Sequence, residues 1–287
     1  LTTLIRYAIL SRTGPVFTSS CRRCGDVCLP FQTCIATNKG KIMIDIQKEI
    51  ERGFANKPAM MWPTYCGRQL DRAQYVTASE VLNCARRIKY EKQWSAEHGN
   101  APFPNWGYAE RGNIIEAWIV EMLQLANLDV RYVGKDQRSF VAGHQSGTPD
   151  GLARAATGEL YALEFKSIDP RTNVRNLPKP NHVAQLQQNM DLIAANLGTG
   201  LHGGILFYID ASNLQKSKQF NIPVDHQMQE DLQDRAERIV AAASPADLPN
   251  EGMFNGDCDR CGFTTECSRL VAGDLTDLQS AEKGAFK

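Results

Sequence analysis

Four cysteines place the strongest constraint on this fold, because three lie close together in the sequence and the fourth does not. Cys258, Cys261 and Cys267 follow one another as C-x2-C-x5-C near the C-terminus, whereas Cys84 lies far upstream. Thiolates with these spacings can surround one soft metal centre. Since such a centre would draw its ligands from both ends of a domain, we expect a metal cluster to hold those ends together.

The composition indicates one large globular domain. A chain of 287 residues with 43% hydrophobic residues can bury a substantial core. Lys plus Arg equals Asp plus Glu, 32 of each, so the chain carries no general positive field for nucleic acid. Any such contact would depend on local basic patches, which are equally well explained as solvated surface charge. The candidate residues are Arg86, Arg87, Lys89 and Lys92, and a loop with Arg171, Arg175 and Lys179.

The cysteine count favours a reducing compartment. Nine cysteines cannot all pair as disulfides, and no convincing secretory signal precedes them. The chain also has no apolar run of about 18 residues that could cross a membrane. We therefore predict a cytoplasmic protein whose clustered cysteines bind metal.

The sequence divides into four segments. Residues 1–42 form an N-terminal extension, residues 43–76 an irregular lead-in, residues 77–270 the main domain and residues 271–287 a tail. Two interpretations of the extension remain open: a small zinc knuckle, or an upstream stretch outside the natural product. The cysteines of the possible knuckle are Cys21, Cys24, Cys28 and Cys34.

Two helices are predicted before the middle of the chain. Thr77 and Glu80 have the spacing of a capping box, which predicts a helix from Thr77 to about Trp94 with Cys84 in its second turn. A second helix is expected over residues 110–127, with Glu116 at the margin of its apolar face, either as a solvated flank or as a metal ligand. The predicted buried positions are Ile115, Trp118, Ile119 and Met122.

A strand is predicted over residues 160–168. Side chains alternate across a strand, so Tyr161, Leu163 and Phe165 should face the core. Glu164 and Lys166 should then share the other face. Asp150 can approach that face if its segment pairs with the strand as a hairpin, with a turn near residues 155–158.

These three polar residues have a chemical logic. Two carboxylates, Asp150 and Glu164, can bind Mg²⁺ or Mn²⁺, which acidifies a bound water and stabilises charge on phosphate. Lys166 can position that water or help to deprotonate it. On its own the pattern also fits an ordinary surface strand with a Glu/Lys ladder.

A helix over residues 181–196 adds support. Its apolar stripe consists of Val183, Leu186, Met190, Ile193 and Leu197, and its polar border of His182, Gln185 and Asn189. The border can edge a cleft, or it can be a plain polar flank. Strands over residues 204–209 and 218–222 and a helix over residues 224–243 complete an α/β pattern. No Walker A sequence is present, which excludes a P-loop motor.

Together these segments closely resemble the PD-(D/E)xK nuclease superfamily, and within it the RecB-like branch with an iron-sulfur cluster. The resemblance rests on Arg111-Gly112-x3-Glu116, Gly147-Thr148-Pro149-Asp150-Gly151, Leu163-Glu164-Phe165-Lys166-Ser167 and Gln185-x3-Asn189. The cysteine arrangement is similar to that of AddB-type nucleases and CRISPR-adaptation exonucleases. The resemblance implies an α/β restriction-endonuclease-like core, with a central mixed sheet flanked by helices and its ends joined by the cluster.

The resemblance also implies roles for individual residues. Glu116, Asp150 and Glu164 would bind Mg²⁺ or Mn²⁺. The catalytic set would be Glu116, Asp150, Glu164, Lys166 and Gln185, and a [4Fe-4S] cluster would be held by Cys84, Cys258, Cys261 and Cys267. Two positions depart from the RecB-like pattern: Glu116 replaces a histidine, as in phage-type exonucleases, and Asn189 replaces a tyrosine.

The implied activity is that of a metal-dependent DNA exonuclease acting on single strands or DNA ends in recombination, repair or phage replication. A separate helicase or recombinase would be a fitting partner. Two alternatives remain open: a structure-specific endonuclease, and a noncatalytic DNA-binding iron-sulfur module.

Overall fold

A computed structural model describes residues 73–98, 106–252 and 257–271 of the chain. All of them belong to one compact unit, residues 58–287. The predicted extension with Cys21, Cys24, Cys28 and Cys34 lies outside the described residues, as do most of the lead-in and nearly all of the tail. None of the described helices is both long enough and apolar enough to cross a membrane.

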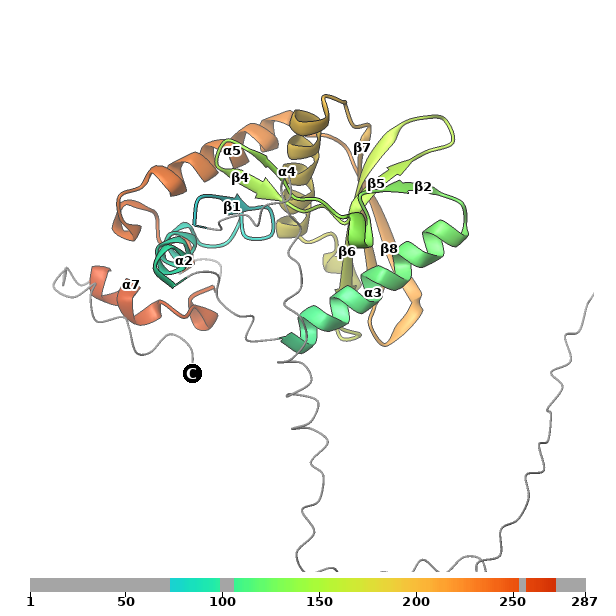
Figure 1. The fold of residues 1–287 in the computed structure, drawn as a ribbon. Helices are drawn as coiled ribbons and strands as arrows, with labels where there is room; N and C mark the ends of the chain where they lie inside the picture. Colours follow the sequence, from blue (N-terminus) through green and yellow to red (C-terminus); the bar gives the residue numbers. More distant parts are fainter. Residues whose placement is uncertain (1–72, 99–105, 253–256, 272–287) are drawn as a thin grey trace, which may run out of the picture. The chain divides into compact units, whose positions relative to one another are not determined.

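A five-stranded mixed sheet forms the centre of the fold, as predicted (Figure 1). Its order is β2-β5-β6-β7-β8. The β5–β6 and β7–β8 pairs are antiparallel, whereas β6 and β7 are parallel and are joined through a helix. The strands are β2 (Asp129–Arg131), β5 (Gly151–Arg154), β6 (Leu160–Ile168), β7 (Gly203–Asp210) and β8 (Asn213–Ile222).

Two helices, α3 (Trp106–Leu125) and α4 (Pro180–Leu197), cover opposite faces of this sheet (Figure 1). Side chains alternate along β6 and β7, so each helix meets a different set of them. The α3 side includes Ile115, Ile119, Ile209, Phe165 and Phe207. The larger cluster on the α4 side includes Ala162, Leu206, Tyr208, Leu186, Met190 and Ile193.

The stripe predicted for α4 is confirmed. Leu186, Met190 and Ile193 are buried, and Val183 and Leu197 pack against the same cluster. Pro180 occupies the first turn, where a missing N–H costs nothing, and Gly198 ends the helix in the left-handed conformation. A Cβ on Gly204 of β7 would meet Leu186 Cδ2 at 2.7 Å, so this glycine lets the helix lie close to the sheet.

A smaller sheet and the remaining helices surround a second core. The three strands run in the order β1-β4-β3, and the core includes Val76, Ile88, Ala184, Leu232 and Ile239. These elements are β1 (Val76–Thr77), β3 (Phe140–Ala142), β4 (Gln145–Gly147), α2 (Ala85–His98), α5 (His226–Ala241) and α7 (Thr264–Val271). Short 3-10 turns cover Gly134–Asp136, Val174–Asn176, Pro245–Asp247 and Asp257–Arg260.

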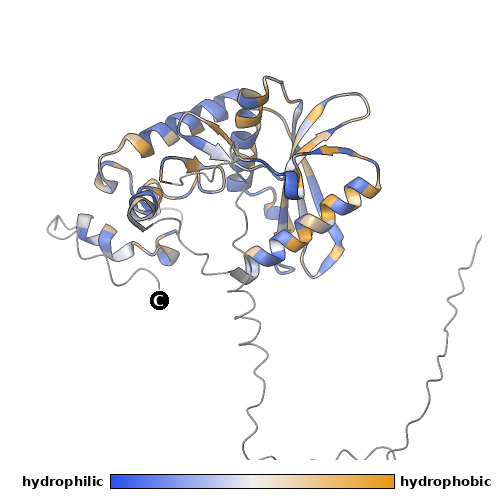
Figure 2. Ribbon diagram, viewed as in Figure 1, coloured by the Kyte–Doolittle hydropathy of each residue, from blue (hydrophilic) through white to orange (hydrophobic). Residues whose placement is uncertain are grey.

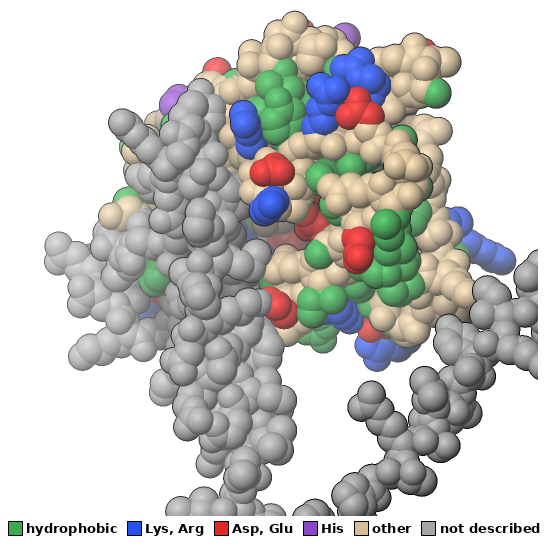
Figure 3. Space-filling model, turned by 45° about the vertical axis from the view of Figure 1, so that its right-hand side comes forward, with side chains coloured by type: hydrophobic (Ala, Val, Ile, Leu, Met, Phe, Trp, Pro, Cys, Tyr) green, Lys and Arg blue, Asp and Glu red, His purple; other side chains and the backbone are tan. Residues whose placement is uncertain are grey.

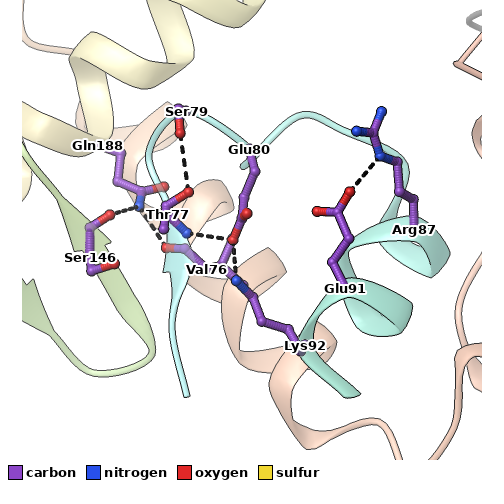
Figure 4. Close-up of polar contacts among 9 residues, drawn as sticks. All are labelled: Val76, Thr77, Ser79, Glu80, Arg87, Glu91, Lys92, Ser146 and Gln188. Carbon is purple, nitrogen blue, oxygen red and sulfur yellow. Dashed lines mark hydrogen bonds and ion pairs between the residues drawn. The ribbon is translucent and has the colours of Figure 1, made fainter. Parts of the chain in front are cut away.

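The helix predicted from Thr77 starts later than the capping box suggested. Glu80 Oε1 does accept from the Thr77 N–H at 2.8 Å (Figure 4), but the Ala78 N–H donates to Ser146 O and holds the chain in the small sheet. Helix α2 therefore begins at Ala85 and runs to His98. Cys84 lies just before it, where its carbonyl accepts the Ile88 N–H at 3.0 Å.

The buried face of α3 was predicted only in part. Ile115 and Ile119 are buried as expected, but Trp118 and Met122 are 37% and 36% exposed. Val120 is buried in their place. Hydrophobic positions recur along the whole length of α3 (Figure 2), so periodicity alone could not select the face that meets the sheet.

Candidate active site and cysteine cavity

The predicted hairpin is present and fixes Asp150 against β6. Gly151 pairs with Leu163, and the turn closes where the Gly158 N–H donates to Ala155 O at 2.9 Å. Asp150 N–H donates to Leu163 O at 3.2 Å, and its carboxylate Oδ2 accepts from the Phe165 N–H at 2.6 Å. One main-chain hydrogen bond thus holds the Asp150 backbone, and another the Asp150 carboxylate, against β6.

Glu164 and Lys166 share one face of β6, as the alternation predicted. Lys166 Nζ lies 2.6 Å from Glu164 Oε1, and the Glu164 side chain is 1% exposed. The assignment of faces needs a correction, because the face that carries Glu164 is the one buried against α4. Phe165, expected in the main core, packs edge-to-face on Phe207 in the smaller cluster under α3.

Asn189 completes the contacts of the Glu164 carboxylate. It is fully buried on α4, and its Nδ2 donates to Glu164 Oε2 at 3.0 Å. Its Oδ1 has no hydrogen-bond partner among the described residues and lies so close to Gly147 of β4 that a Cβ on this glycine would overlap it. The glycine of the Gly147-Thr148-Pro149-Asp150 motif therefore makes room for the amide that positions Glu164.

Three crowded carboxylates dominate the electrostatics. Burial first, and then the charge of Glu164, raise the pKa of Glu116 to about 7, against an opposing contribution from Lys166. Burial followed by repulsion from Glu164 and Glu116 raises the pKa of Asp150 well above its usual range. Burial alone would lower the pKa of Lys166, but the attraction of Glu164 and Asp150 raises it.

Glu116 reaches this site from α3 and is half-buried. Gln137 Nε2 lies 3.5 Å from Glu116 Oε1 and donates to Pro149 O at 3.1 Å, so it links α3 to the segment before Asp150. Sequence analysis missed Gln137, since nothing in its neighbourhood marks it as a site residue.

The polar border of α4 divides into three different environments. Asn189 contacts Glu164, and His182 Nδ1 lies 2.8 Å from the hydroxyl of Tyr208. Burial, then the charges of Lys166 and Lys179, lower the pKa of His182 to about 3. Gln185 is half-buried, and its amide forms no hydrogen bond within the described ranges. It thus remains available to a ligand.

The donor set fits a hard divalent cation. Carboxylate oxygen is the preferred ligand of Mg²⁺ and Mn²⁺, and a cation would offset the repulsion that raises the pKa values of Glu116 and Asp150. As the side chains stand, no group of three or more Asp, Glu, His or Cys residues in the described part of the chain is already arranged around a metal position. Lys166 currently provides the positive charge beside Glu164.

The four predicted cluster cysteines meet at one cavity. Cys84, Cys258, Cys261 and Cys267 are free thiols that line a space of about 300 Å³, although Cys84 comes from the opposite end of the domain. The nearby thiols affect one another: burial first, and then Cys84 and Cys267, raise the pKa of Cys258. The stacked rings of Tyr90 and Phe263, 5.1 Å apart, close part of the cavity wall.

One of the two predicted basic patches is mostly internal. Lys92 is buried and ion-paired with Glu80 (Figure 4), while Lys89 Nζ donates to Val240 O at 2.9 Å. Arg87 pairs with Glu91 at 2.8 Å. Arg86 Nε donates to Leu248 O at 2.7 Å, and its Nη1 approaches Cys267 Sγ at 3.8 Å. These cations stabilise α2 and the cavity rather than forming a surface patch.

The cavity fits a group larger than a single ion. Four sulfurs face a space that a cluster of several atoms can fill, and Arg86 supplies an N–H···S contact of the kind that tunes iron-sulfur centres. Two lining residues, Tyr90 and Asn250, also carry buried polar atoms without partners. Four thiols at one site, one of them buried and three half-buried, are ligands suited to a [4Fe-4S] cluster.

No model of a known protein family matches this chain, and no curated protein matches it. The crystal structures to which it is similar include the following three. SSO0001 has a TM-score of 0.44 and 20% identity, covering 77% of this chain and 93% of that one. The alkaline exonuclease LHK-Exo from Laribacter hongkongensis has a TM-score of 0.47, 18% identity, and coverage of 59% and 88%. A phage related exonuclease from Haemophilus somnus 129PT has a TM-score of 0.44, 12% identity, and coverage of 57% and 91%. Likenesses of this size do not establish a shared activity.

Proposed function

We propose that this chain is a DNA nuclease that hydrolyses phosphodiester bonds with a divalent cation, as an exonuclease on single strands or DNA ends. One observation carries the proposal: Glu116, Asp150 and Glu164 crowd together beside Lys166, and burial and repulsion raise the pKa values of the first two. Buried carboxylates that repel one another destabilise a fold, and a bound cation offsets that repulsion. Such groups therefore occur mainly at functional sites. A cation bound between the substrate phosphate and these carboxylates would supply the positive charge.

The residues of the site would have different roles in cleavage. Glu116, Asp150 and Glu164 would hold Mg²⁺ or Mn²⁺, which supplies an acidified water and stabilises charge on the phosphate. Lys166 places an ammonium group beside them, where it can orient the attacking water and offset negative charge. Gln185 lies one turn before Asn189 on α4, and no described residue bonds its amide. We expect this amide to orient the substrate.

The loop between β6 and α4 is suited to hold the DNA backbone. Arg171 has an 89% exposed side chain, and Arg175 and Lys179 are also exposed. On the face drawn in Figure 3, the Lys and Arg side chains of the described residues stand in separate groups and form no continuous basic surface. Contact with a few phosphates near the cut site, rather than a long charged track, is therefore the expected binding mode.

We further propose that Cys84, Cys258, Cys261 and Cys267 hold a [4Fe-4S] cluster. The cluster would join the start of α2 to the segment that leads into α7, and so tie together chain ends that the central sheet does not connect. Its role would be structural, because these sulfurs come from different elements than the carboxylates.

A cleavage assay with three substrates tests the nuclease proposal. End-labelled single-stranded and double-stranded DNA are incubated with the protein in Mg²⁺ or Mn²⁺, next to a covalently closed circle and a chelator control. We expect linear substrates to shorten from an end while the circle stays intact. Cutting of the circle would instead identify a structure-specific endonuclease, and DNA binding without any cleavage would identify a noncatalytic module.

A further inference from the structure

A short chain of hydrogen bonds fixes the orientation of His182. The imidazole Nδ1 lies 2.8 Å from the hydroxyl oxygen of Tyr208, a residue that is completely buried on β7. The main-chain N–H of Lys179 donates to the same hydroxyl at 3.1 Å. The edge of Phe220 packs against the Tyr208 ring, with centroids 5.9 Å apart, so the phenol cannot easily turn away.

These contacts determine which nitrogen of His182 carries the proton. A main-chain amide can only donate, so the Tyr208 oxygen accepts from Lys179 and its own proton must go elsewhere. His182 Nδ1 is the one acceptor within reach of this hydroxyl among the described residues. Nδ1 therefore carries a lone pair, and the ring proton lies on Nε2. The opposite tautomer would leave the buried Tyr208 proton without an acceptor.

The other edge of the ring is open. No described residue forms a hydrogen bond with His182 Nε2, and this atom is absent from the buried polar atoms that lack partners. His182 stands one helical turn before Gln185 on α4, and Tyr208 pairs in register with Lys166 across β6 and β7. An N–H donor is thus presented next to the proposed cleavage site.

We propose that His182 is a further catalytic residue, which donates its Nε2–H to a nonbridging oxygen of the phosphate being cleaved, with Tyr208 as its positioning residue. This inference rests on the proposed nuclease function. A neutral imidazole adds a donor without adding a second cation beside Lys166. Because Nε2 is protonated and Nδ1 is engaged, His182 cannot serve as the general base. An anionic phosphate oxygen is the acceptor that gains most from such a fixed donor.

Two measurements test the inference. The first is a long-range proton–nitrogen NMR spectrum of histidine-labelled protein, with His182 assigned from the His182→Ala spectrum. Wild type should show the Nε2–H tautomer at neutral pH, and Tyr208→Phe should show a mixture. A wild-type Nδ1–H tautomer would overturn the inference whatever the enzyme cleaves.

The second measurement is single-turnover DNA cleavage, together with Mn²⁺ binding by calorimetry. His182→Ala should lower the rate about 100-fold, the usual loss for one donor to developing charge, with Mn²⁺ affinity unchanged. His182→Gln retains an N–H near Nε2 and should recover part of the rate. Tyr208→Phe keeps the packed ring and should lose about tenfold, since the donor is present but no longer oriented.

The control is His202→Ala, which removes an exposed histidine whose ring packs against that of Tyr161. It should cleave at the wild-type rate. An active wild type with a fully active, folded His182→Ala variant would overturn the donor role and leave the nuclease proposal intact. A wild type that cleaves no DNA under any metal condition would remove both proposals.

Discussion

The carboxylate site and the cysteine cavity are built in opposite ways. In the first, protein donors hold the functional groups: Asp150 accepts from the Phe165 N–H, and Glu164 accepts from Lys166 and Asn189. In the second, four thiols face a space of about 300 Å³, and among the described residues their sulfurs are contacted by Arg86 at Cys267 and by the Phe263 main chain at Cys261. Tyr90 and Asn250 add buried polar atoms without partners to its wall.

The protein's own hydrogen bonds therefore fix the carboxylates, whereas a bound ligand would be needed to fix the thiols. The hairpin and α4 already fix the carboxylate site, so changes there should affect chemistry far more than stability. The cysteine cavity joins segments that are remote in sequence, so changes there should affect stability first. Substitutions at the two sites should therefore have different consequences.

The largest effect is expected from Asp150→Ala, Glu164→Ala and Lys166→Ala. Each should lower Mg²⁺-dependent or Mn²⁺-dependent cleavage about 1000-fold or more, because both water activation and charge stabilisation depend on these groups. Circular dichroism should show an intact fold. Asp129→Ala is the matched control, since it removes an exposed carboxylate that pairs with the surface residues Arg131 and Arg154. Wild-type cleavage by Asp150→Ala would refute the site.

The next effect is on stability. Anaerobically purified protein should be brown and carry about four irons per chain. Cys84→Ala and Cys261→Ala should lose iron and about 2–4 kcal/mol of unfolding free energy, by analogy with a cross-link that closes a long loop. Thermal melts and iron analysis provide the measurement, with Ser268→Ala of the cavity wall as control. Zinc in place of iron would preserve a metal cross-link between the two segments but exclude the iron-sulfur cluster. A Cys84→Ala protein as stable as wild type would mean that Cys84 is only a core residue.

A smaller effect is expected from Asn189→Leu. This change removes the 3.0 Å bond to Glu164 Oε2 but keeps the volume, so the carboxylate loses one of its two side-chain donors. Mn²⁺ affinity, measured by calorimetry, should fall about tenfold, as is typical when a ligand's orienting partner is lost. Asn181→Leu on the exposed first turn of α4 should change nothing. Equal affinities in the two variants would mean that Asn189 only fills space.

The smallest effect is expected from a chain that starts at Met43. Every motif of the site follows residue 76, and the compact unit that contains it begins at Pro58. The shortened protein should therefore retain its cleavage rate and its iron content, which are the quantities to measure. Loss of folding, or one zinc per chain bound through Cys21 to Cys34, would argue for a true N-terminal zinc knuckle.

Local patterns were sufficient to predict the centre of the site. The alternation of residues 160–168 placed Glu164 and Lys166 on one face, and the hairpin expected to bring Asp150 there has its turn at residues 155–158 as predicted. The stripe on α4 predicted its packing because only one of its faces is apolar. In each of these cases the signal lies within a few neighbouring residues.

Non-local contacts account for the errors. The helix expected from Thr77 is delayed because its backbone pairs with β4, about 70 residues later in the sequence. Lys92 seemed a surface cation, yet it is buried against Glu80, and Trp118 is exposed because α3 is apolar on more than one side. The bond between His182 and Tyr208 joins α4 to β7, and no spacing in the sequence announces it.

We propose that Glu164 and its neighbours hold the divalent cation with which this protein hydrolyses DNA. The most direct test is the single-turnover cleavage rate of end-labelled linear DNA against Mn²⁺ concentration, for wild type and Glu164→Gln. We expect the wild-type rate to saturate with Mn²⁺ concentration and the variant's rate to be about 1000-fold lower at every Mn²⁺ concentration. Equal rates in the two proteins, or wild-type cleavage that persists in a metal chelator, would contradict this proposal.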